Sequence, residues 1–165
     1  MVSLRKSLGL RTFFNLLGPL VNPAKPKYSM IGTYNPEIAR IYQYLLQKDE
    51  KDFILVHGID GYDEISLTQD SKIITKGGEK IYSPDELGFT AVTPESIEAG
   101  KNTKETAKIF RNILEGKGTA VVLANAAVAL HHTNKFENYE NCLNLAKESL
   151  FNGKALNSLN QLIIV

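Results

Sequence analysis

Three carboxylates lie close together after a short apolar segment and are the first candidates for chemistry. Asp60, Asp63 and Glu64 follow the segment Asp52–His57, whose composition is typical of a buried strand. Ligands of open α/β sheets gather at the carboxyl ends of strands, which is where this loop is expected to lie. Adjacent carboxylates such as Asp63 and Glu64 can hold magnesium, which usually binds one or two carboxylates together with substrate phosphates. The residue types alone equally allow ordinary solvated acids of a turn.

Two arginines near the N-terminus are the second candidates. Arg5 and Arg11 precede a rigid turn at Gly18–Pro19, and a guanidinium is the natural bidentate partner of a carboxylate or phosphate. A solvated or ion-paired arginine on the surface is the ordinary alternative. The residue types do not choose between Arg5 and Arg11.

The remaining reactive side chains are better explained by structure than by catalysis. His57 could act as a general base, although a histidine at the end of a strand is more often a hydrogen-bonded structural residue. The pair His131–His132 has no acid or cysteine at ligand spacing, and Cys142 lies in an amphipathic segment typical of a core. The sequence contains none of the common nucleotide-loop, serine-hydrolase or zinc-protease motifs, so it offers no catalytic residue.

These candidates need a scaffold, and the residue pattern predicts one of strands and helices. A strand over 28–34, a helix that starts at Asn35–Pro36–Glu37 and a strand over 52–57 indicate a crossover between parallel strands. Further short strands are predicted over 65–68, 72–75 and 79–82, and further helices over 103–114, 120–131, 139–152 and 156–162. We therefore expect an α/β fold with a mixed, largely parallel sheet flanked by helices.

Two parts of this scaffold carry more specific expectations. In the helix that starts near Asn35, helical spacing predicts one buried face, formed by Ile38, Ile41, Tyr42 and Leu45. Near the N-terminus, short helices over 3–8 and 12–17 precede a stiff connection over 18–27 that holds three prolines and a glycine.

Composition and charge limit the class of protein. At 165 residues, with 43% hydrophobic and 22% charged residues, the chain has the content of a globular protein and the length of one domain. Its 19 basic and 18 acidic residues give a net charge of +1, which argues against nucleic acid or an anionic membrane as the default partner. Cys142 is the single cysteine, and no apolar run reaches the length of a membrane span. We expect a cytoplasmic protein.

Three segments of the chain resemble the anthranilate phosphoribosyltransferases, the enzymes of that name in tryptophan biosynthesis. They occur in the same order over nearly the whole chain: Arg5–Pro23 (RKSLGLRTFFNLLGPLVNP), His57–Ser66 (HGIDGYDEIS) and Asn125–Ala127 (NAA). The resemblance covers only the C-terminal half of that family, and this chain lacks the glycine-rich loop that holds phosphoribosyl pyrophosphate (PRPP). It therefore implies a C-terminal portion of such an enzyme that is inactive alone.

The resemblance assigns roles to individual residues. Arg5 matches the arginine that recognises the anthranilate carboxylate, and Gly18–Pro19 matches the loop beside this substrate. Asp63 and Glu64 match the acidic pair that binds magnesium on the pyrophosphate of PRPP, where two ions are expected. His57, Asp60 and Arg11 are left as scaffold, and no catalytic acid or base is implied.

The resemblance also implies an organisation for the whole protein. The expected fold is of the nucleoside phosphorylase/phosphoribosyltransferase type, here incomplete, with the active site in a cleft between two domains. Residues 1–24 would form part of a small helical domain and its hinge, and residues 25–165 the C-terminal part of the α/β domain. A homodimer is expected for the full-length protein, with neither a nucleic acid nor a membrane as partner.

Two other hypotheses share this fold. A transferase-like protein that binds nucleic acid would show a basic groove and lack the arginine or the acidic pair. A pyrimidine nucleoside phosphorylase would use inorganic phosphate and lack the pattern of Arg5–Pro23. Because Arg5, Asp63 and Glu64 are all present and the net charge is close to zero, the transferase is the favoured hypothesis.

Overall fold

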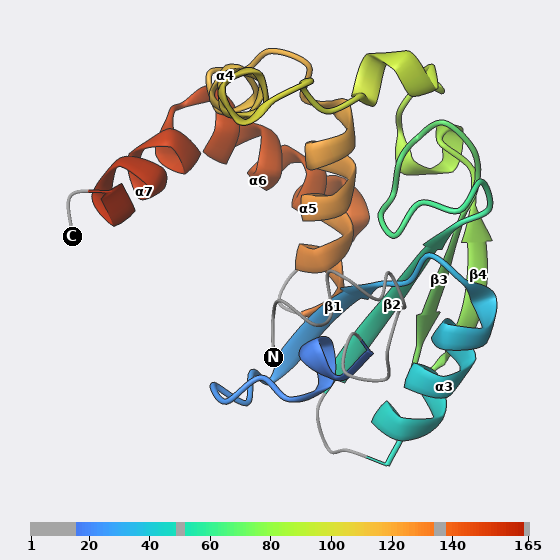
Figure 1. Cartoon of the computed structure of the whole chain (residues 1–165). Coiled ribbons are helices and arrows are strands. Elements are labelled where there is room, and N and C mark those ends of the chain that lie inside the picture. Colours follow the sequence, from blue (N-terminus) through green and yellow to red (C-terminus); the bar gives the residue numbers. More distant parts are fainter. Residues whose placement is uncertain (1–15, 49–51, 134–137, 164–165) are drawn as a thin grey trace.

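The chain folds into one sheet with helices around it, as the computed structural model shows for residues 16–48, 52–133 and 138–163 (Figure 1). The strands are β1 (Tyr28–Gly32), β2 (Asp52–Gly58), β3 (Ser71–Thr75) and β4 (Gly78–Tyr82). The helices are α3 (Pro36–Leu46), α4 (Thr103–Leu114), α5 (Ala120–His132), α6 (Tyr139–Phe151) and α7 (Lys154–Ile163). Short 3₁₀ turns are η1 (Gly18–Leu20), η2 (Asp85–Leu87) and η3 (Pro94–Ile97).

The four strands lie in the order β1-β2-β3-β4. β1 and β2 are parallel, with Tyr28 opposite Asp52 and Gly32 opposite Val56, whereas β2–β3 and β3–β4 are antiparallel. The prediction of a mixed sheet with flanking helices is confirmed. In the described part the parallel share is smaller than expected, because residues 71–82 fold as an antiparallel hairpin. The predicted strand over 65–68 is wrong, since these residues belong to a loop.

Alternate residues of β2 build a core on each face of the sheet. Ile54 and Val56 pack with Ala124 and Val128 of α5 on one face. On the other face Phe53 and Leu55 of β2 pack with Ala39 and Tyr42 of α3. Figure 1 accordingly shows α3 and α5 on opposite sides of the sheet, with α6 beyond α5. The carboxyl ends of β1 and β2 are thus held side by side between two helical layers.

Helix α3 starts where the sequence predicts, but its buried face is rotated from the predicted one. Asn35 caps the helix and accepts a hydrogen bond from the Glu37 N–H at 2.7 Å. Tyr42 is buried as expected, whereas Ile41 is 51% exposed and Leu45 is 46% exposed. The residues that face the sheet are Ile38, Ala39, Tyr42 and Leu46. With Ala39 and Tyr42 facing the sheet, Ile41 and Leu45 fall on the outward side of the helix.

The other predicted helices are confirmed to within two residues at each end. A reciprocal cap precedes η2, as its sequence spacing indicates: the Ser83 N–H donates to Glu86 at 2.9 Å, and the Glu86 N–H donates to Ser83 at 3.2 Å. Hydrogen bonding to the backbone of Ser83 holds the pKa of Glu86 below its ordinary value. Within the described residues, no helix combines the length and the apolar character needed to cross a membrane.

The N-terminal helices predicted over 3–8 and 12–17 fall almost wholly outside the described residues, so the small helical domain stays a prediction. The segment that follows is tied to α3, because the Tyr42 hydroxyl donates to the Leu16 carbonyl oxygen at 2.7 Å. Leu16 and Leu20 also pack on the apolar cluster beneath α3. These contacts fix the Gly18–Pro19 turn relative to the sheet.

Candidate active site

The three candidate carboxylates lie on the loop between β2 and β3, residues 59–70, which we call the acidic loop. The loop folds back on the end of β2. The Gly58 N–H donates to the Tyr62 carbonyl at 2.9 Å, and the Gly61 N–H donates to the Gly58 carbonyl at 2.9 Å. A β-carbon on Gly58 would lie 2.7 Å from Oδ1 of Asp60 and 3.2 Å from the Tyr62 carbonyl oxygen, so a larger residue would have to displace the Asp60 side chain. The acidic loop is therefore an ordered structure at the carboxyl end of β2.

The C-terminal part of the acidic loop is anchored in the core. Ile65 and Leu67 are completely buried and belong to the apolar cluster between β2 and α5. Asn125 of α5 bonds both backbone groups of Ile65: the Ile65 N–H donates to Oδ1 at 3.1 Å, and Nδ2 donates to the Ile65 carbonyl at 2.9 Å. Asp63 and Glu64 are exposed and come immediately before this anchor. Their backbone is thus fixed beside the core, while both residues remain exposed overall and Glu64 also lines a pocket next to α4 and α5.

The acidic loop also contacts the end of β1, a contact that the sequence analysis missed. Gly32 is the last residue of β1, and a β-carbon built on it would lie 1.7 Å from the backbone oxygen of Asp63. Only a glycine therefore allows the backbone of Asp63 to lie this close to β1. The signal was present in the sequence as a lone glycine inside a predicted strand, but its partner is 31 residues further along the chain.

Two of the polar candidates serve the scaffold, as the sequence analysis expects. His57 is buried, and its Nδ1 lies 2.7 Å from the carbonyl oxygen of Thr33. Because a carbonyl oxygen only accepts, Nδ1 carries the proton and is the donor. Thr33 in turn donates to the Val56 carbonyl through its N–H and its hydroxyl, at 2.8 and 3.1 Å. Asp60 accepts a hydrogen bond from the Thr68 hydroxyl across the acidic loop.

Asp63 and Glu64 form a site of uncompensated negative charge. Among the described residues, no lysine or arginine forms an ion pair with either carboxylate. Partial burial raises the pKa of Glu64 above its ordinary value, and the neighbouring charge of Asp63 raises it further. In the described part of the chain, no group of three or more histidine, cysteine or acidic side chains could hold a metal ion. A magnesium ion at Asp63 and Glu64 would complete its coordination with oxygen ligands from water or a bound phosphate.

The Gly18–Pro19 turn borders a pocket that extends along β1 as far as Gly32. The pocket has a volume of about 610 Å³ and is lined by the connection between η1 and β1 and by β1 itself. Its wall includes Gly18, Pro19 and, at the far end of β1, Gly32. Gly32 is also the residue on which Asp63 packs. Gly32 thus lies between the Gly18–Pro19 pocket, which is the predicted anthranilate side, and the acidic loop that carries Asp63 and Glu64.

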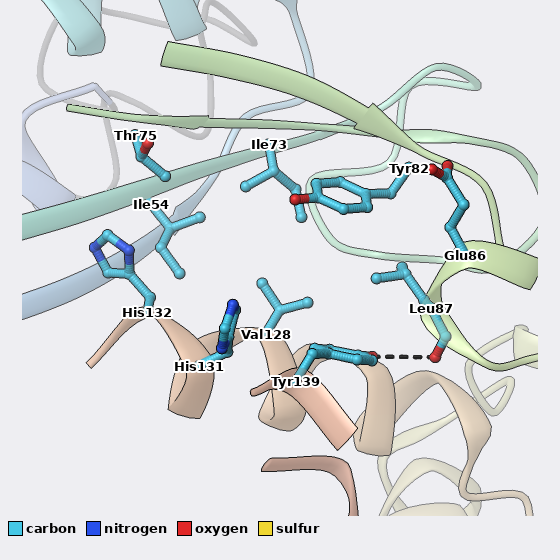
Figure 2. Close-up of a pocket in the computed structure, with 10 residues that line it drawn as sticks. All are labelled: Ile54, Ile73, Thr75, Tyr82, Glu86, Leu87, Val128, His131, His132 and Tyr139. Atoms are coloured by element: carbon cyan, nitrogen blue, oxygen red, sulfur yellow. Dashed lines mark hydrogen bonds between the residues drawn. The ribbon is translucent and has the colours of Figure 1, made fainter. Parts of the chain in front are cut away.

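Arg5 and Arg11 lie outside the described residues, so their predicted roles stay untested. Cys142 is buried in α6, where burial raises the pKa of its thiol, in keeping with the expected core role. His131 and His132 line a separate cavity of about 320 Å³ between β2, β3 and the end of α5 (Figure 2). None of the residues that line this cavity belongs to the acidic loop.

Comparison with known proteins assigns the family. The sequence model of the protein family described as "Glycosyl transferase family, a/b domain" matches residues 1–156. The chain belongs to this glycosyl transferase family. The matched residues include both the acidic loop and the Gly18–Pro19 turn.

Two relatives of this glycosyl transferase chain carry the same enzyme name. The anthranilate phosphoribosyltransferase of Bacteroides thetaiotaomicron is 45% identical over 164 residues, covering 97% of this chain and 49% of that protein. The enzyme of the same name from Flavobacterium johnsoniae is 46% identical over 163 residues, covering 96% of this chain and 49% of that protein. The chain spans about half the length of the curated relatives that it matches.

Solved structures agree with these sequence relatives. Anthranilate phosphoribosyltransferase from Saccharomyces cerevisiae in complex with PRPP and Mg matches with a TM-score of 0.86 at 27% identity, over 96% of this chain and 47% of that chain. The enzyme from Thermus thermophilus matches with a TM-score of 0.84 at 29% identity, over 96% of this chain and 49% of that chain. The glycosyl transferase fold of the chain is therefore found in proteins of the same name from yeast and bacteria.

Proposed function

We propose that the full-length protein containing this chain is an anthranilate phosphoribosyltransferase, a pentosyltransferase of tryptophan biosynthesis. This chain would supply its C-terminal portion. The observation that carries the proposal is the meeting of the Gly18–Pro19 pocket and the acidic loop at Gly32. Relatives above 40% identity that carry this enzyme name support it.

The two sides of this meeting point take different substrates. Gly18 and Pro19 would border the flat ring of anthranilate, whose carboxylate Arg5 would recognise through its guanidinium. Asp63 and Glu64 would hold magnesium, with two ions expected on the pyrophosphate of PRPP. Because no described lysine or arginine forms an ion pair with either carboxylate, their charge fits a cation that shares its ligands with a phosphate. Magnesium supplies charge stabilisation of the leaving pyrophosphate when it is bound.

The proposed reaction replaces one bond at the anomeric carbon of PRPP. The amine nitrogen of anthranilate forms a bond to this carbon, the bond to the pyrophosphate oxygen breaks, and the nitrogen loses a proton to solvent. This chemistry depends on holding two substrates in line rather than on a strong base. His57 fits that view, because its Nδ1 proton is already donated to Thr33 and its ring is buried. The residues of this chain would therefore orient the substrates and stabilise charge.

The remaining parts of the proposal concern the whole protein. A homodimer in the cytoplasm is expected, with anthranilate and PRPP as ligands. The domain boundary near residue 24 would separate a small helical domain from the α/β domain.

The loss of anthranilate fluorescence on addition of PRPP and magnesium tests the proposed function. The assay is run on the full-length protein, and we expect turnover that stops when magnesium is chelated. A stable full-length protein that binds both ligands without turnover would contradict the proposal. The 165 residues on their own should show no turnover, because they carry no glycine-rich phosphate loop.

A further inference from the structure

The side chain of Asn125 connects helix α5 to the acidic loop through two hydrogen bonds to the backbone of Ile65. The residue lies 60 positions beyond Ile65, yet its amide group pairs with both the N–H and the carbonyl of Ile65, at 3.1 and 2.9 Å. Neighbouring strands exchange the same two hydrogen bonds, one to an N–H and one to a carbonyl, but here a side chain on a helix makes both of them. Ile65 is the residue directly after Glu64. The contact thus acts on the backbone that carries the acidic pair.

The orientation of the Asn125 amide is fixed by its own helix. Besides the bond to Ile65, Nδ2 donates to the Val121 carbonyl at 2.9 Å. A flipped amide would place Oδ1 against two carbonyl oxygens, so only one orientation satisfies the contacts. The neighbouring Ala124 and Ala127 are completely buried, which holds this part of α5 firmly in the core. Asn125 therefore projects from a rigid support.

The acidic pair lies between two such fixed points. On one side the backbone of Asp63 packs on Gly32 of β1, and on the other side Ile65 is held by Asn125. Only Glu64 separates these two contacts along the chain. We propose that Asn125 is a positioning residue for magnesium and pyrophosphate, acting through Ile65 on Asp63 and Glu64. This rests on the proposed function, in which these carboxylates hold magnesium.

The isosteric change Asn125→Asp in the full-length protein tests the role. The variant keeps an oxygen that accepts from the Ile65 N–H, but replaces Nδ2 by an oxygen that faces the carbonyls of Ile65 and Val121. We expect the magnesium concentration for half-maximal activity and the KM for PRPP each to rise roughly tenfold. The KM for anthranilate should change less than twofold, because the Gly18–Pro19 pocket has no contact with Asn125 among its lining residues.

Val128→Ala provides the matched control on the same helix. Val128 is buried against the sheet one turn beyond Asn125, so its truncation should lower the melting temperature without changing the magnesium dependence. A folded Asn125→Asp variant with the magnesium dependence of the wild type would overturn the inference. An inactive wild-type protein would instead overturn the proposed function, whatever Asn125 does.

Hydrogen exchange in the wild-type protein gives a second test that needs no variant. Because the Ile65 N–H donates to a fixed amide, we expect it to exchange as slowly as the amides of α5 in the absence of ligands. Exchange of the Ile65 amide at the rate of exposed loop amides would overturn the positioning role. This measurement applies even if Asn125→Asp does not fold.

Discussion

The backbone of Asp63 occupies the space that a side chain at Gly32 would need. A β-carbon on Gly32 would lie 1.7 Å from the Asp63 carbonyl oxygen and 2.7 Å from its carbonyl carbon. Both atoms belong to the backbone, so they cannot move aside as the end of a flexible side chain could. This contact places the acidic loop at the end of β1 and beside the pocket of Gly18 and Pro19.

Gly32→Ala should therefore displace the acidic loop. In the full-length protein we expect magnesium-dependent activity to fall roughly tenfold or more, because displacements near 1 Å at a reacting centre cost up to about 100-fold. The added carbon should also lower the free energy of unfolding by about 1–3 kcal/mol. Steady-state kinetics and urea unfolding measure the two effects.

Gly77→Ala is the matched control for this change. Gly77 lies before β4, where a β-carbon would meet only the Thr75 hydroxyl at an ordinary 3.7 Å. We expect wild-type kinetics from this variant. Equal activity of Gly32→Ala and Gly77→Ala would show that the acidic loop does not depend on Gly32.

His57 should matter for stability and not as a base. His57→Leu leaves the buried Thr33 carbonyl without its donor, which should lower the free energy of unfolding by about 1–3 kcal/mol. His57→Asn can still offer an N–H donor and should be milder. In both variants the pH profile of kcat should keep its shape. Loss of an ionisation from that profile in His57→Asn would indicate a general base instead.

The ionised Glu64 side chain should lower the thermal stability of the metal-free protein at neutral pH. A carboxyl whose pKa is higher in the folded than in the unfolded chain costs stability above its folded pKa, and the cost disappears below its unfolded value. Glu64→Gln should therefore raise the melting temperature in chelator at pH near 8, with no difference at pH near 4. Asp63→Asn should give a smaller gain, because burial and not Asp63 is the main cause. A Glu64→Gln melting temperature at or below the wild-type value at pH near 8 would contradict this origin.

His132 should make the protein sensitive to mild acid. Its Nε2 is buried without a hydrogen-bond partner among the described residues, and burial lowers the pKa of the imidazole, against an opposing effect of Asp52. A lowered folded pKa means that stability is lost as pH falls below the unfolded value of about 6.5. His132→Leu should flatten the decline of the urea midpoint between pH of about 7.5 and 5.5. His131→Leu, at an exposed position of the same cavity, should flatten it less, because the charge of His131 is only the smallest of the three causes that act on the pKa of His132 (Figure 2).

Local signals predicted most elements of the fold. Caps at Asn35 and Ser83 and the helical spacing of residues 103–114 and 120–131 depend on neighbours within a few positions, so they are visible in the sequence. The strand predicted over 65–68 contains Ile65 and Leu67. Both side chains are indeed buried, but the backbone turns between them, with φ of 61° at Leu67.

The candidate site was predicted less completely than the fold. Asp63 and Glu64 stood out as adjacent acids after an apolar strand, and the resemblance pointed to the same pair. The supports of that pair could not be predicted, because Gly32 and Asn125 contact the acidic loop from 31 and 60 residues away. Long-range backbone contacts of this kind leave no periodic pattern in a single sequence. Only the structure shows that they meet at Asp63 and Ile65.

Magnesium-dependent binding of PRPP tests the central claim most directly. Calorimetry would compare the full-length wild type with the double variant Asp63→Ala, Glu64→Ala, for PRPP with magnesium and separately for anthranilate. We predict that PRPP binding weakens roughly tenfold or more, about 1.4 kcal/mol or more, while anthranilate binding changes less than twofold. Equal weakening of both ligands, or PRPP binding at the wild-type level, would contradict the assignment of the acidic loop to magnesium and pyrophosphate.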